Sequence, residues 1–201
     1  MNVFVLGTGR CGTSTFVAAC RHFSNYTAGH ETLSRKVGAA RLAYPPDHIE
    51  ADNRLSWLLG RLDAAFGRDA FYVHLLRDPE AVAVSYATRW KEGIGTLPAA
   101  YHRGILQQSP EDRLAICRDL VTTVTANVEV FLRDKPHQMT MHLESAVEAF
   151  PLFCRAIGAA GDLEAATAAW NTRHNATPKG SWAERRARRK VGRALRAVRL
   201  R

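Results

Sequence analysis

Residues 7–14 (GTGRCGTS) combine residue types that could bind phosphate. Gly7 and Gly12 have the spacing of the glycines in the GxxxxGK[ST] phosphate-binding loop. Glycines let successive backbone N–H groups turn toward phosphate oxygens, and the following helix N-terminus favours an anion. Thr13 stands where that motif has lysine, so the cation of this loop is Arg10. The segment predicts an anion site without the γ-phosphate clamp of triphosphatases; the alternative is a glycine-rich turn without a ligand.

A second group of candidate phosphate ligands follows the apolar run at 71–76. Arg77 comes directly after this run, Asp78 and Pro79 come next, and Ser85 lies eight residues after Arg77. Aspartate before proline is typical of a helix N-cap. Arg77 then lies at the carboxyl end of a predicted strand, where α/β sheets bind ligands. Arginine and a hydroxyl suit a phosphate monoester; the alternative is a structural ion pair between Arg77 and Asp78.

Together these segments resemble motifs of the sulfotransferases that use 3′-phosphoadenosine 5′-phosphosulfate (PAPS), in particular the bacterial and carbohydrate-type members. Residues 3–16 resemble the loop that binds the 5′-phosphosulfate, and residues 74–79 with Ser85 resemble the 3′-phosphate motif. Residues 177–182 resemble the loop that closes over the 3′-phosphate, although Lys179 could equally be an exposed loop lysine. The resemblance implies donor-binding roles for ten residues: Gly9, Arg10, Cys11, Gly12, Thr13, Ser14, Arg77, Ser85, Lys179 and Gly180.

The resemblance also implies catalytic roles. Carbohydrate sulfotransferases of this family often carry a catalytic glutamate at the distance where Glu31 stands, 19 residues after Gly12, so Glu31 is the predicted general base. His30 is the second candidate, because histidine is the base in other branches. Arg10 is predicted to meet the bridging and leaving-group oxygens, so no metal is expected. The alternative for both bases is a solvated loop residue, and residues 52–57 either line the acceptor site or form a helix cap.

The elements that must position these residues follow from the hydrophobic pattern. Short apolar runs predict buried strands, and apolar positions three or four apart predict amphipathic helices. Their alternation predicts an α/β fold with a mostly parallel central sheet, and the resemblance implies the three-layer arrangement of P-loop NTPases, with helices flanking the sheet. Strands are predicted over 2–6, 71–76 and 138–143, and helices over 13–23, 54–66, 79–90, 111–133, 145–157 and 162–170. An irregular long loop or lid is predicted over 93–110 and an ordered loop over 171–182.

The positive charge of the chain is concentrated at its C-terminus. The formal net charge of the 201 residues is +9, and residues 183–201 contribute +8 of it. Because the remainder is nearly neutral, the high pI does not predict nucleic-acid binding. We expect one domain over 1–182 and a basic tail over 183–201, which is either a solvated terminal helix or an amphipathic helix on anionic lipid.

Targeting signals are not evident in the sequence. No apolar run approaches the ~20 residues that span a bilayer, and the apolar start breaks at Gly7 without a basic leader. The four cysteines form no CxxC pair. We therefore expect a cytoplasmic protein with reduced thiols, whose membrane contact, if any, is peripheral and made by the tail.

The expected function is transfer of a sulfuryl group from PAPS to a hydroxyl of a small molecule or glycan, with a carbohydrate or glycolipid as the expected acceptor. The nucleotide product is 3′-phosphoadenosine 5′-phosphate (PAP). Two alternatives stay open. One is a P-loop kinase that uses ATP, against which Thr13 argues; the other is a non-catalytic module that binds membrane or nucleic acid through the tail.

Overall fold

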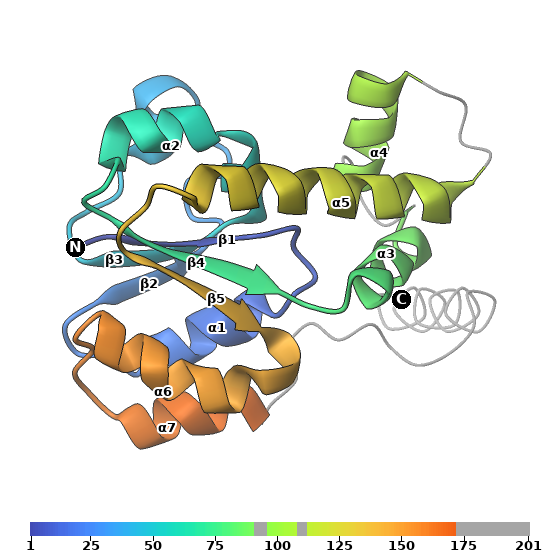
Figure 1. The fold of residues 1–201 in the computed structure, drawn as a ribbon. Coiled ribbons are helices and arrows are strands. Elements are labelled where there is room, and N and C mark those ends of the chain that lie inside the picture. The colour runs from blue at the N-terminus through green and yellow to red at the C-terminus, as the bar shows by residue number, and fades with distance from the viewer. Residues whose placement is uncertain (91–95, 108–111, 172–201) are drawn as a thin grey trace, which may run out of the picture.

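The computed structural model describes residues 1–90, 96–107 and 112–171, and within them five strands form one all-parallel sheet (Figure 1). Its order is β2-β3-β1-β4-β5. Because β1 pairs with both β3 and β4, the segments that follow these strands come together at the carboxyl edge of the sheet. The strands are β1 (Val3–Leu6), β2 (Thr27–His30), β3 (His48–Ala51), β4 (Phe71–Leu76) and β5 (Gln138–His142).

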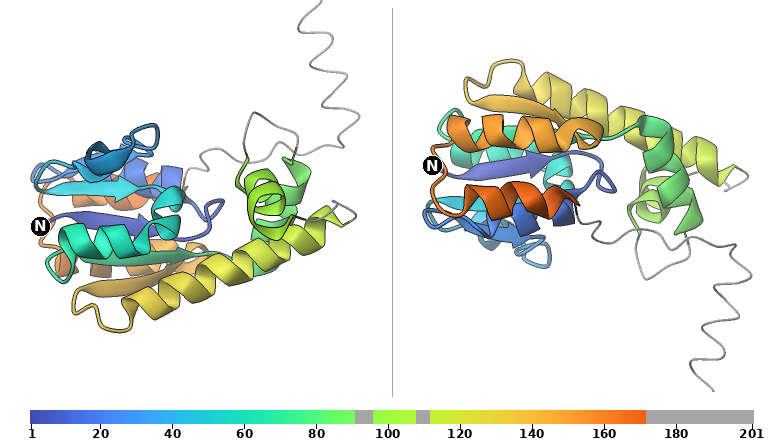
Figure 2. Two further views of the ribbon diagram at one scale, coloured as in Figure 1. Left: turned by 90° about the horizontal axis from the view of Figure 1, so that it is seen from above. Right: turned by 90° about the horizontal axis from the view of Figure 1, so that it is seen from below.

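Helices cover both faces of the sheet, which gives the expected three layers (Figures 1 and 2). One face is covered by α1, α6 and α7, and the other by α2 and α5, with α3 packed against α5. The bounds are α1 (Thr13–Cys20), α2 (Leu59–Phe66), α3 (Pro79–Thr88), α4 (Leu97–Tyr101), α5 (Arg113–Leu132), α6 (Ala146–Ala156) and α7 (Leu163–Ala168). Single helical turns are η1 (Gly38–Leu42), η2 (Asn53–Trp57), η3 (His102–Leu106), η4 (Leu143–Ser145) and η5 (Ala169–Asn171).

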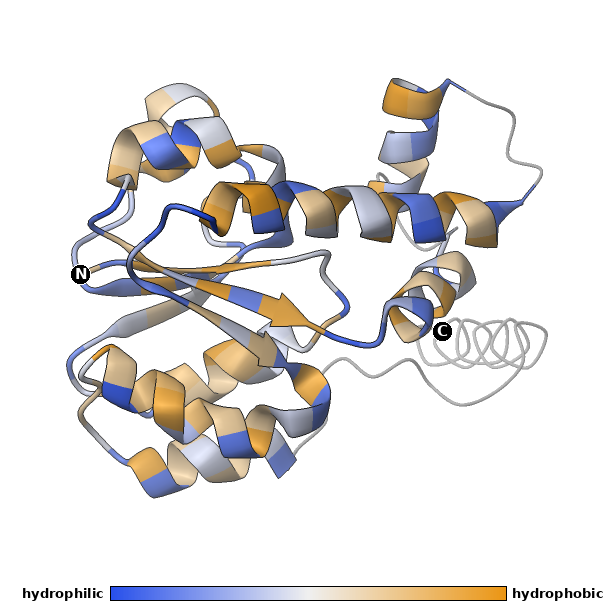
Figure 3. Ribbon diagram, viewed as in Figure 1, coloured by the Kyte–Doolittle hydropathy of each residue, from blue (hydrophilic) through white to orange (hydrophobic). Residues whose placement is uncertain are grey.

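The burial of the central strand β1 on both faces explains why its sequence is a continuous apolar run. None of its four residues is exposed. Val3 and Val5 join the core beneath α1 and α6, whereas Phe4 and Leu6 join the core beneath α2 and α5. Alternate side chains of a strand point to opposite faces, so a strand covered on both sides is apolar throughout. The apolar colouring of the central strands in Figure 3 follows from this burial.

The predicted strands β1, β4 and β5 are confirmed, but β2 and β3 were not predicted. The sequence of β2 is Thr-Ala-Gly-His, which has no apolar alternation. In β3 the buried positions include His48 and Glu50, whose side chains hydrogen-bond to each other at 3.0 Å. Burial of polar groups that satisfy each other is invisible to a hydrophobic pattern.

Two predicted elements differ in the structure. The loop prediction over 93–110 is wrong for its described part, where α4 and the π-helical turn η3 stand. Pro98 lies in the first turn of α4, where its missing N–H costs no hydrogen bond, and Tyr101 is buried against α5. The helix predicted over 54–66 is divided into the 3₁₀ turn η2 and the helix α2.

The helices α3 and α4 and the N-terminal part of α5 lie beyond the carboxyl edge of the sheet, on the side of the loop that follows β1 (Figures 1 and 2). The C-terminal ends of parallel strands are the usual ligand-binding edge of such sheets. Within the described residues, no helix has both the length and the apolar character that crossing a bilayer requires.

Candidate functional site

The loop between β1 and α1 has a tight, left-handed backbone. Gly9 has φ of 77°, and a Cβ there would lie 2.3 Å from the Nδ2 atom of Asn53. Gly12 is the N-cap of α1 with φ of 96°, and a Cβ there would lie 2.6 Å from Leu143. Arg10 has φ of 61°, a conformation uncommon for residues other than glycine. The glycine positions are therefore required by the backbone, as a phosphate-binding loop needs.

Neighbouring elements hold this loop in place. The backbone N–H of Gly7 donates to Ser56 Oγ, and this hydroxyl donates back to the Gly7 carbonyl, both at 3.0 Å. The phenol of Tyr86 on α3 donates to the Thr8 carbonyl and accepts from Asn53 Nδ2 at 3.3 Å. Burial raises the pKa of Tyr86, so the phenol keeps its proton near neutral pH. The turn η2 and the helix α3 thus clamp the loop from one side.

The two predicted phosphate motifs meet in the structure. The Arg10 Nε atom donates to Ser85 Oγ at 3.1 Å, and Arg77 Nη1 donates to the Arg10 carbonyl at 3.1 Å. Asp78 caps α3 by accepting from a backbone N–H in its first turn, which fixes the register that places Ser85. The alternative of an Arg77–Asp78 ion pair is therefore not what the structure shows. Arg10 and Ser85, which are 75 positions apart in sequence, thus form one cationic cluster with Arg77.

The charge of Arg89, the C-cap residue of α3, also acts on Arg10, and this residue was not predicted. Burial, then the charge of Arg89, then that of Arg77 lower the pKa of Arg10. Arg89 follows Ser85 by four residues, so both side chains leave the same face of α3. The spacing of four residues between Ser85 and Arg89 was the signal in the sequence that could have identified Arg89. It becomes informative only when the position of Ser85 in the site is known.

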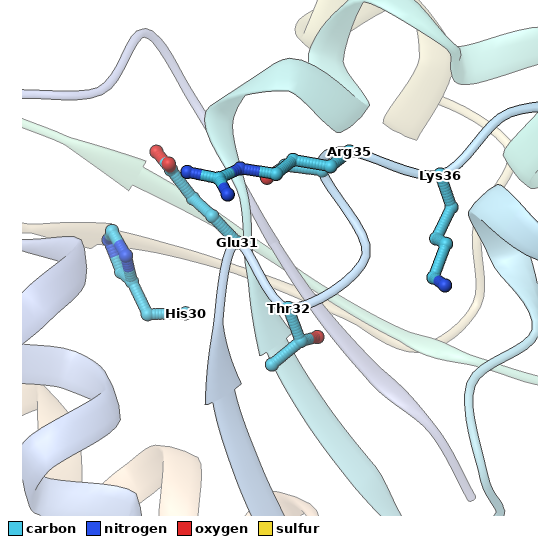
Figure 4. A pocket seen from close by; sticks show the side chains of 6 residues that line it. His30, Glu31, Thr32, Arg35 and Lys36 are labelled. Atoms are coloured by element: carbon cyan, nitrogen blue, oxygen red, sulfur yellow. The ribbon is translucent and has the colours of Figure 1, made fainter.

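The two candidate bases lie at the end of β2, across from the start of α1. His30 Nε2 and Thr13 Oγ1 share a hydrogen bond of 3.0 Å, so His30 contacts the phosphate loop directly. Glu31 has φ of 55°, and its Oε2 atom lies 2.7 Å from Arg54 Nη1. Both candidates line a pocket of about 600 Å³, formed by His30, Glu31, Thr32, Ser34, Arg35 and Lys36. Figure 4 shows Glu31 and Arg35 extending to the same side, whereas Lys36 points away from them.

A buried carboxylate fixes the turn at Glu31. Glu50 on β3 is fully buried, and its Oε1 atom accepts from the Thr32 backbone N–H at 2.7 Å. Its Oε2 atom accepts from the Thr32 hydroxyl and contacts His48 Nε2 at 3.0 Å. These contacts hold the residue next to Glu31, so the left-handed turn there is braced from inside the protein.

A buried ion pair anchors the segment that follows the pocket. Arg41 on η1 donates to the Asp52 carboxylate, and the two side chains are almost wholly buried. Burial by itself lowers the pKa of Arg41, but Asp52 and Tyr44 more than offset this and raise it. Asp52 also accepts from the Arg54 backbone N–H at 2.8 Å, as the cap of η2. The prediction of a cap at residues 52–57 is confirmed.

The remaining predicted site residues differ in what the structure says of them. Cys11 is fully buried, and burial raises the pKa of its thiol to about 11, so it is a neutral part of the loop rather than a nucleophile. Ser14 lies half-buried in the first turn of α1. Lys179 and Gly180, the loop predicted at 171–182 beyond its first residue, and the basic tail lie outside the described residues. Within the described ranges, no three His, Cys, Asp or Glu side chains gather so as to hold a metal ion.

Comparison with solved structures finds this architecture in a known protein, the sulfotransferase domain from the curacin biosynthetic pathway. The TM-score is 0.58 and the sequence identity 12%, over 94% of this chain and 96% of that chain. No protein-family model matches the sequence, and no curated protein matches it. The chain therefore has the fold of a sulfotransferase domain, and at this identity the likeness extends to the fold alone.

Proposed function

We propose that this protein transfers a sulfuryl group from PAPS to a hydroxyl acceptor. The observation that carries the proposal is the hydrogen bond between Arg10 and Ser85, together with the bond from Arg77 to the Arg10 carbonyl. It joins a glycine-rich loop at a helix N-terminus to a separate arginine and hydroxyl at one edge of a parallel sheet. A nucleotide with phosphate groups at both its 5′ and 3′ positions matches two such anion sites.

The residues of the loop suit a phosphosulfate better than a triphosphate. Thr13 stands where kinase loops of this type carry the lysine that reaches the β- and γ-phosphates. Arg10 supplies the charge from within the loop, and its planar fork can donate two hydrogen bonds to one group. We therefore favour PAPS over ATP as the donor, with residues 9–14, Arg77 and Ser85 as its ligands.

The acceptor must lose a proton as its oxygen bonds to sulfur. In the balanced step, that oxygen forms the new S–O bond, the bond from sulfur to the bridging oxygen breaks, and PAP leaves with the electron pair. Glu31 takes the proton, because its carboxylate lines the pocket beside the loop. His30 orients Thr13 and is the competing candidate for the base.

A pocket that is open and lined by polar side chains suits a polyhydroxylated acceptor. Its lining offers hydroxyl, carboxylate and cationic groups and no large apolar side chain. We propose a carbohydrate or glycolipid hydroxyl as the acceptor, with the protein acting in the cytoplasm and any membrane contact made through the basic tail at 183–201. No role in nucleic-acid binding is proposed.

The test begins with calorimetric titration of PAP and ATP in buffer without magnesium. We expect PAP to bind at least ten times more tightly than ATP, and Arg77→Ala to weaken PAP binding by about 1.5–3 kcal/mol. The protein is then incubated with PAPS and a mixed extract of sugars and glycolipids, and mass spectrometry searches for a gain of one sulfuryl group. Tighter binding of ATP, or transfer of a phosphoryl group from it, contradicts the proposal.

A further inference from the structure

A chain of polar contacts runs from the sheet to the turn that carries Glu31. The side chains of Thr27 on β2 and His48 on β3 share a hydrogen bond of 2.8 Å, and His48 Nε2 lies 3.0 Å from Glu50 Oε2. The two carboxylate oxygens of Glu50 accept from Thr32, one from its backbone N–H and the other from its hydroxyl. Because Thr32 directly follows Glu31, this chain ends at the backbone of the proposed base.

A second chain of contacts starts from the same histidine and ends at the carboxylate of the proposed base. The ring of Tyr44 stacks on that of His48 with centroids 5.5 Å apart, and its phenol accepts from Arg41 at 3.0 Å. Arg41 donates to Asp52, which accepts from the backbone N–H of Arg54. The guanidinium of Arg54 then meets the carboxylate of the base at 2.7 Å. The two chains therefore close into a ring beneath the turn.

Glu50 is the member of this ring that holds the backbone of the turn. We propose that Glu50 is a positioning residue for sulfuryl transfer: it acts through Thr32 to hold the Glu31 carboxylate where it meets the acceptor hydroxyl. This inference rests on the proposed function. Glu50 has no exposed surface, so it cannot contact the acceptor itself. Its hydrogen bonds within the described residues go to Thr32 and His48, which leaves the donor site outside its direct reach.

The backbone of Glu31 needs such support. Its φ of 55° lies in the left-handed region, which residues other than glycine keep only where neighbouring contacts hold them. The side chain of Glu31 is a third exposed, and an exposed ion pair such as that with Arg54 orients a carboxylate only weakly. We therefore expect the contacts between Glu50 and Thr32 to set most of the orientation of the base. A misplacement of about 1 Å in a reacting group can lower a rate about 10²-fold.

The experiment is a double-mutant cycle on Glu50 and Thr32. Glu50→Leu removes both acceptor oxygens, and Thr32→Val removes only the hydroxyl that donates to one of them. Sulfuryl transfer is measured with a fixed amount of the mixed extract of sugars and glycolipids while the PAPS concentration is varied. We expect the maximal rate to fall about ten- to a hundredfold in Glu50→Leu and about three- to tenfold in Thr32→Val. The KM for PAPS and the calorimetric affinity for PAP should change less than about twofold, because both belong to the donor site.

The cycle separates the two roles that Thr32 could have, since its side chain also lines the pocket. If Thr32 acts through Glu50, adding Thr32→Val to Glu50→Leu lowers the rate no further. Thr32→Ser keeps the hydroxyl and should restore the wild-type rate. A loss in the double variant equal to the product of the two single losses overturns the proposal, because it shows that Thr32 acts independently of Glu50.

Lys135→Met is the matched control for a loss of stability. Lys135 is also a buried charged residue, but it precedes β5 at the opposite edge of the sheet, where it pairs with Asp63 and Asp134. We expect this variant to melt at a lower temperature and to keep the wild-type maximal rate. Hydrogen exchange at the Thr32 backbone N–H, followed by NMR, gives a readout that does not depend on turnover. It should be at least about tenfold faster in Glu50→Leu and unchanged in Lys135→Met.

Thermal melting shows whether each variant is folded. If Glu50→Leu is not, Glu50→Gln replaces it, because the amide keeps one oxygen for the Thr32 N–H, and the expected fall in maximal rate is then about three- to tenfold.

The outcomes separate this inference from the function on which it rests. A wild-type protein that transfers no sulfuryl group from PAPS overturns the proposed function and the role of Glu50 with it. Transfer by the wild type that the folded Glu50 variant leaves unchanged overturns the role of Glu50 alone. A fall in rate that Lys135→Met shares also overturns it, because the fall then follows from lower stability. So does a loss of PAP affinity as large as the loss of rate, because it places the effect in the donor site.

Discussion

The two halves of the candidate site are built in different ways. The proposed donor half, residues 7–14 with Arg77 and Ser85, is held mainly by hydrogen bonds to backbone carbonyls and N–H groups of the loop. The proposed acceptor half, residues 30–36, is held by carboxylates and their partners: Glu31 with Arg54 and Glu50 with Thr32. The donor half therefore depends on backbone shape, and the acceptor half depends on charged side chains.

This difference predicts how each half responds to substitution. A loop whose backbone is fixed by glycines tolerates no added side chain at Gly9 or Gly12, but any ligand that fits its N–H groups can bind. A site made by side chains can be changed one group at a time. Apart from those at His30, which hydrogen-bonds to Thr13, substitutions in the acceptor half should therefore change turnover while nucleotide affinity, the property of the donor half, stays the same.

The largest expected effect is that of Glu31→Gln. Removing a general base typically lowers the rate about 10²–10⁴-fold. Because Glu31 lies outside the donor half, we expect PAP affinity to be unchanged in the calorimeter while sulfuryl transfer falls by a factor in that range. Arg10→Ala, by contrast, should lose both PAP affinity and turnover, because Arg10 belongs to the cationic cluster.

His30→Ala is the discriminating variant for this prediction. If Glu31→Gln keeps full turnover and His30→Ala loses it, the base is His30. Since His30 shares a hydrogen bond with Thr13, His30→Ala is also expected to weaken PAP binding slightly, whereas Glu31→Gln is not. Measuring both properties on both variants therefore shows where the boundary between the halves lies.

The second effect concerns stability rather than turnover. Asp52→Asn leaves Arg41 buried without its carboxylate, and breaking a buried pair in this way costs about 3–5 kcal/mol. We expect a loss of that size in the free energy of unfolding from urea titrations. Asp47→Asn is the comparison, because Asp47 is exposed and its ion pair is with the N-terminal amine, and it should cost less than about 1 kcal/mol. Equal losses of unfolding free energy in the two variants would mean that the buried Arg41–Asp52 pair does not stabilise the segment that follows the pocket.

The strand beneath the donor half gives a pH dependence. His74 on β4 is 2% exposed, and its Nε2 atom has no hydrogen-bond partner among the residues that the structure describes. Burial, followed by the charge of His142, lowers the pKa of His74 to about 4. Between about pH 6.5 and pH 4, this histidine is therefore protonated in the unfolded chain but not in the folded chain. Stability from this group is complete above about pH 6.5 and is lost as the pH falls toward about 4, by roughly 3 kcal/mol.

His74→Phe should flatten this dependence. We expect its unfolding free energy to fall less steeply than that of the wild type between pH 6.5 and pH 4, measured by urea titration at each pH. His22→Gln serves as the control, because His22 is exposed, and its slope should match the wild type. A slope unchanged in His74→Phe would show that other groups cause the acid sensitivity.

The same difference between the halves explains what the sequence could predict. Glycine spacing, the Asp78-Pro79 cap and apolar runs are local signals, and they located the loop, β1, β4 and α3. The strands β2 and β3 were not predicted, because their burial depends on polar pairs such as His48 with Glu50, which a hydrophobic pattern does not reveal. Residues 52–57 were named as a candidate lining of the acceptor site, but the pairing of Arg54 with Glu31 was not predicted, because it joins positions 23 residues apart. The influence of Arg89 on Arg10 was not predicted either, because it depends on where α3 lies.

The smallest expected effect tests the contact between Arg54 and Glu31. Both side chains are more than a quarter exposed, and such ion pairs contribute only about 0.2–1 kcal/mol because water screens them. Arg54→Met should therefore lower turnover only about two- to fivefold, by letting the Glu31 carboxylate leave the geometry in which it meets the acceptor. Its PAP affinity should equal that of the wild type, since Arg54 makes no contact with the phosphate loop among the hydrogen bonds of the described residues.

Arg54→Lys keeps the charge and should recover most of the turnover. If Arg54→Met instead lowers turnover as much as Glu31→Gln, the ion pair is essential to the base, and the acceptor half is more rigid than its exposed contacts indicate.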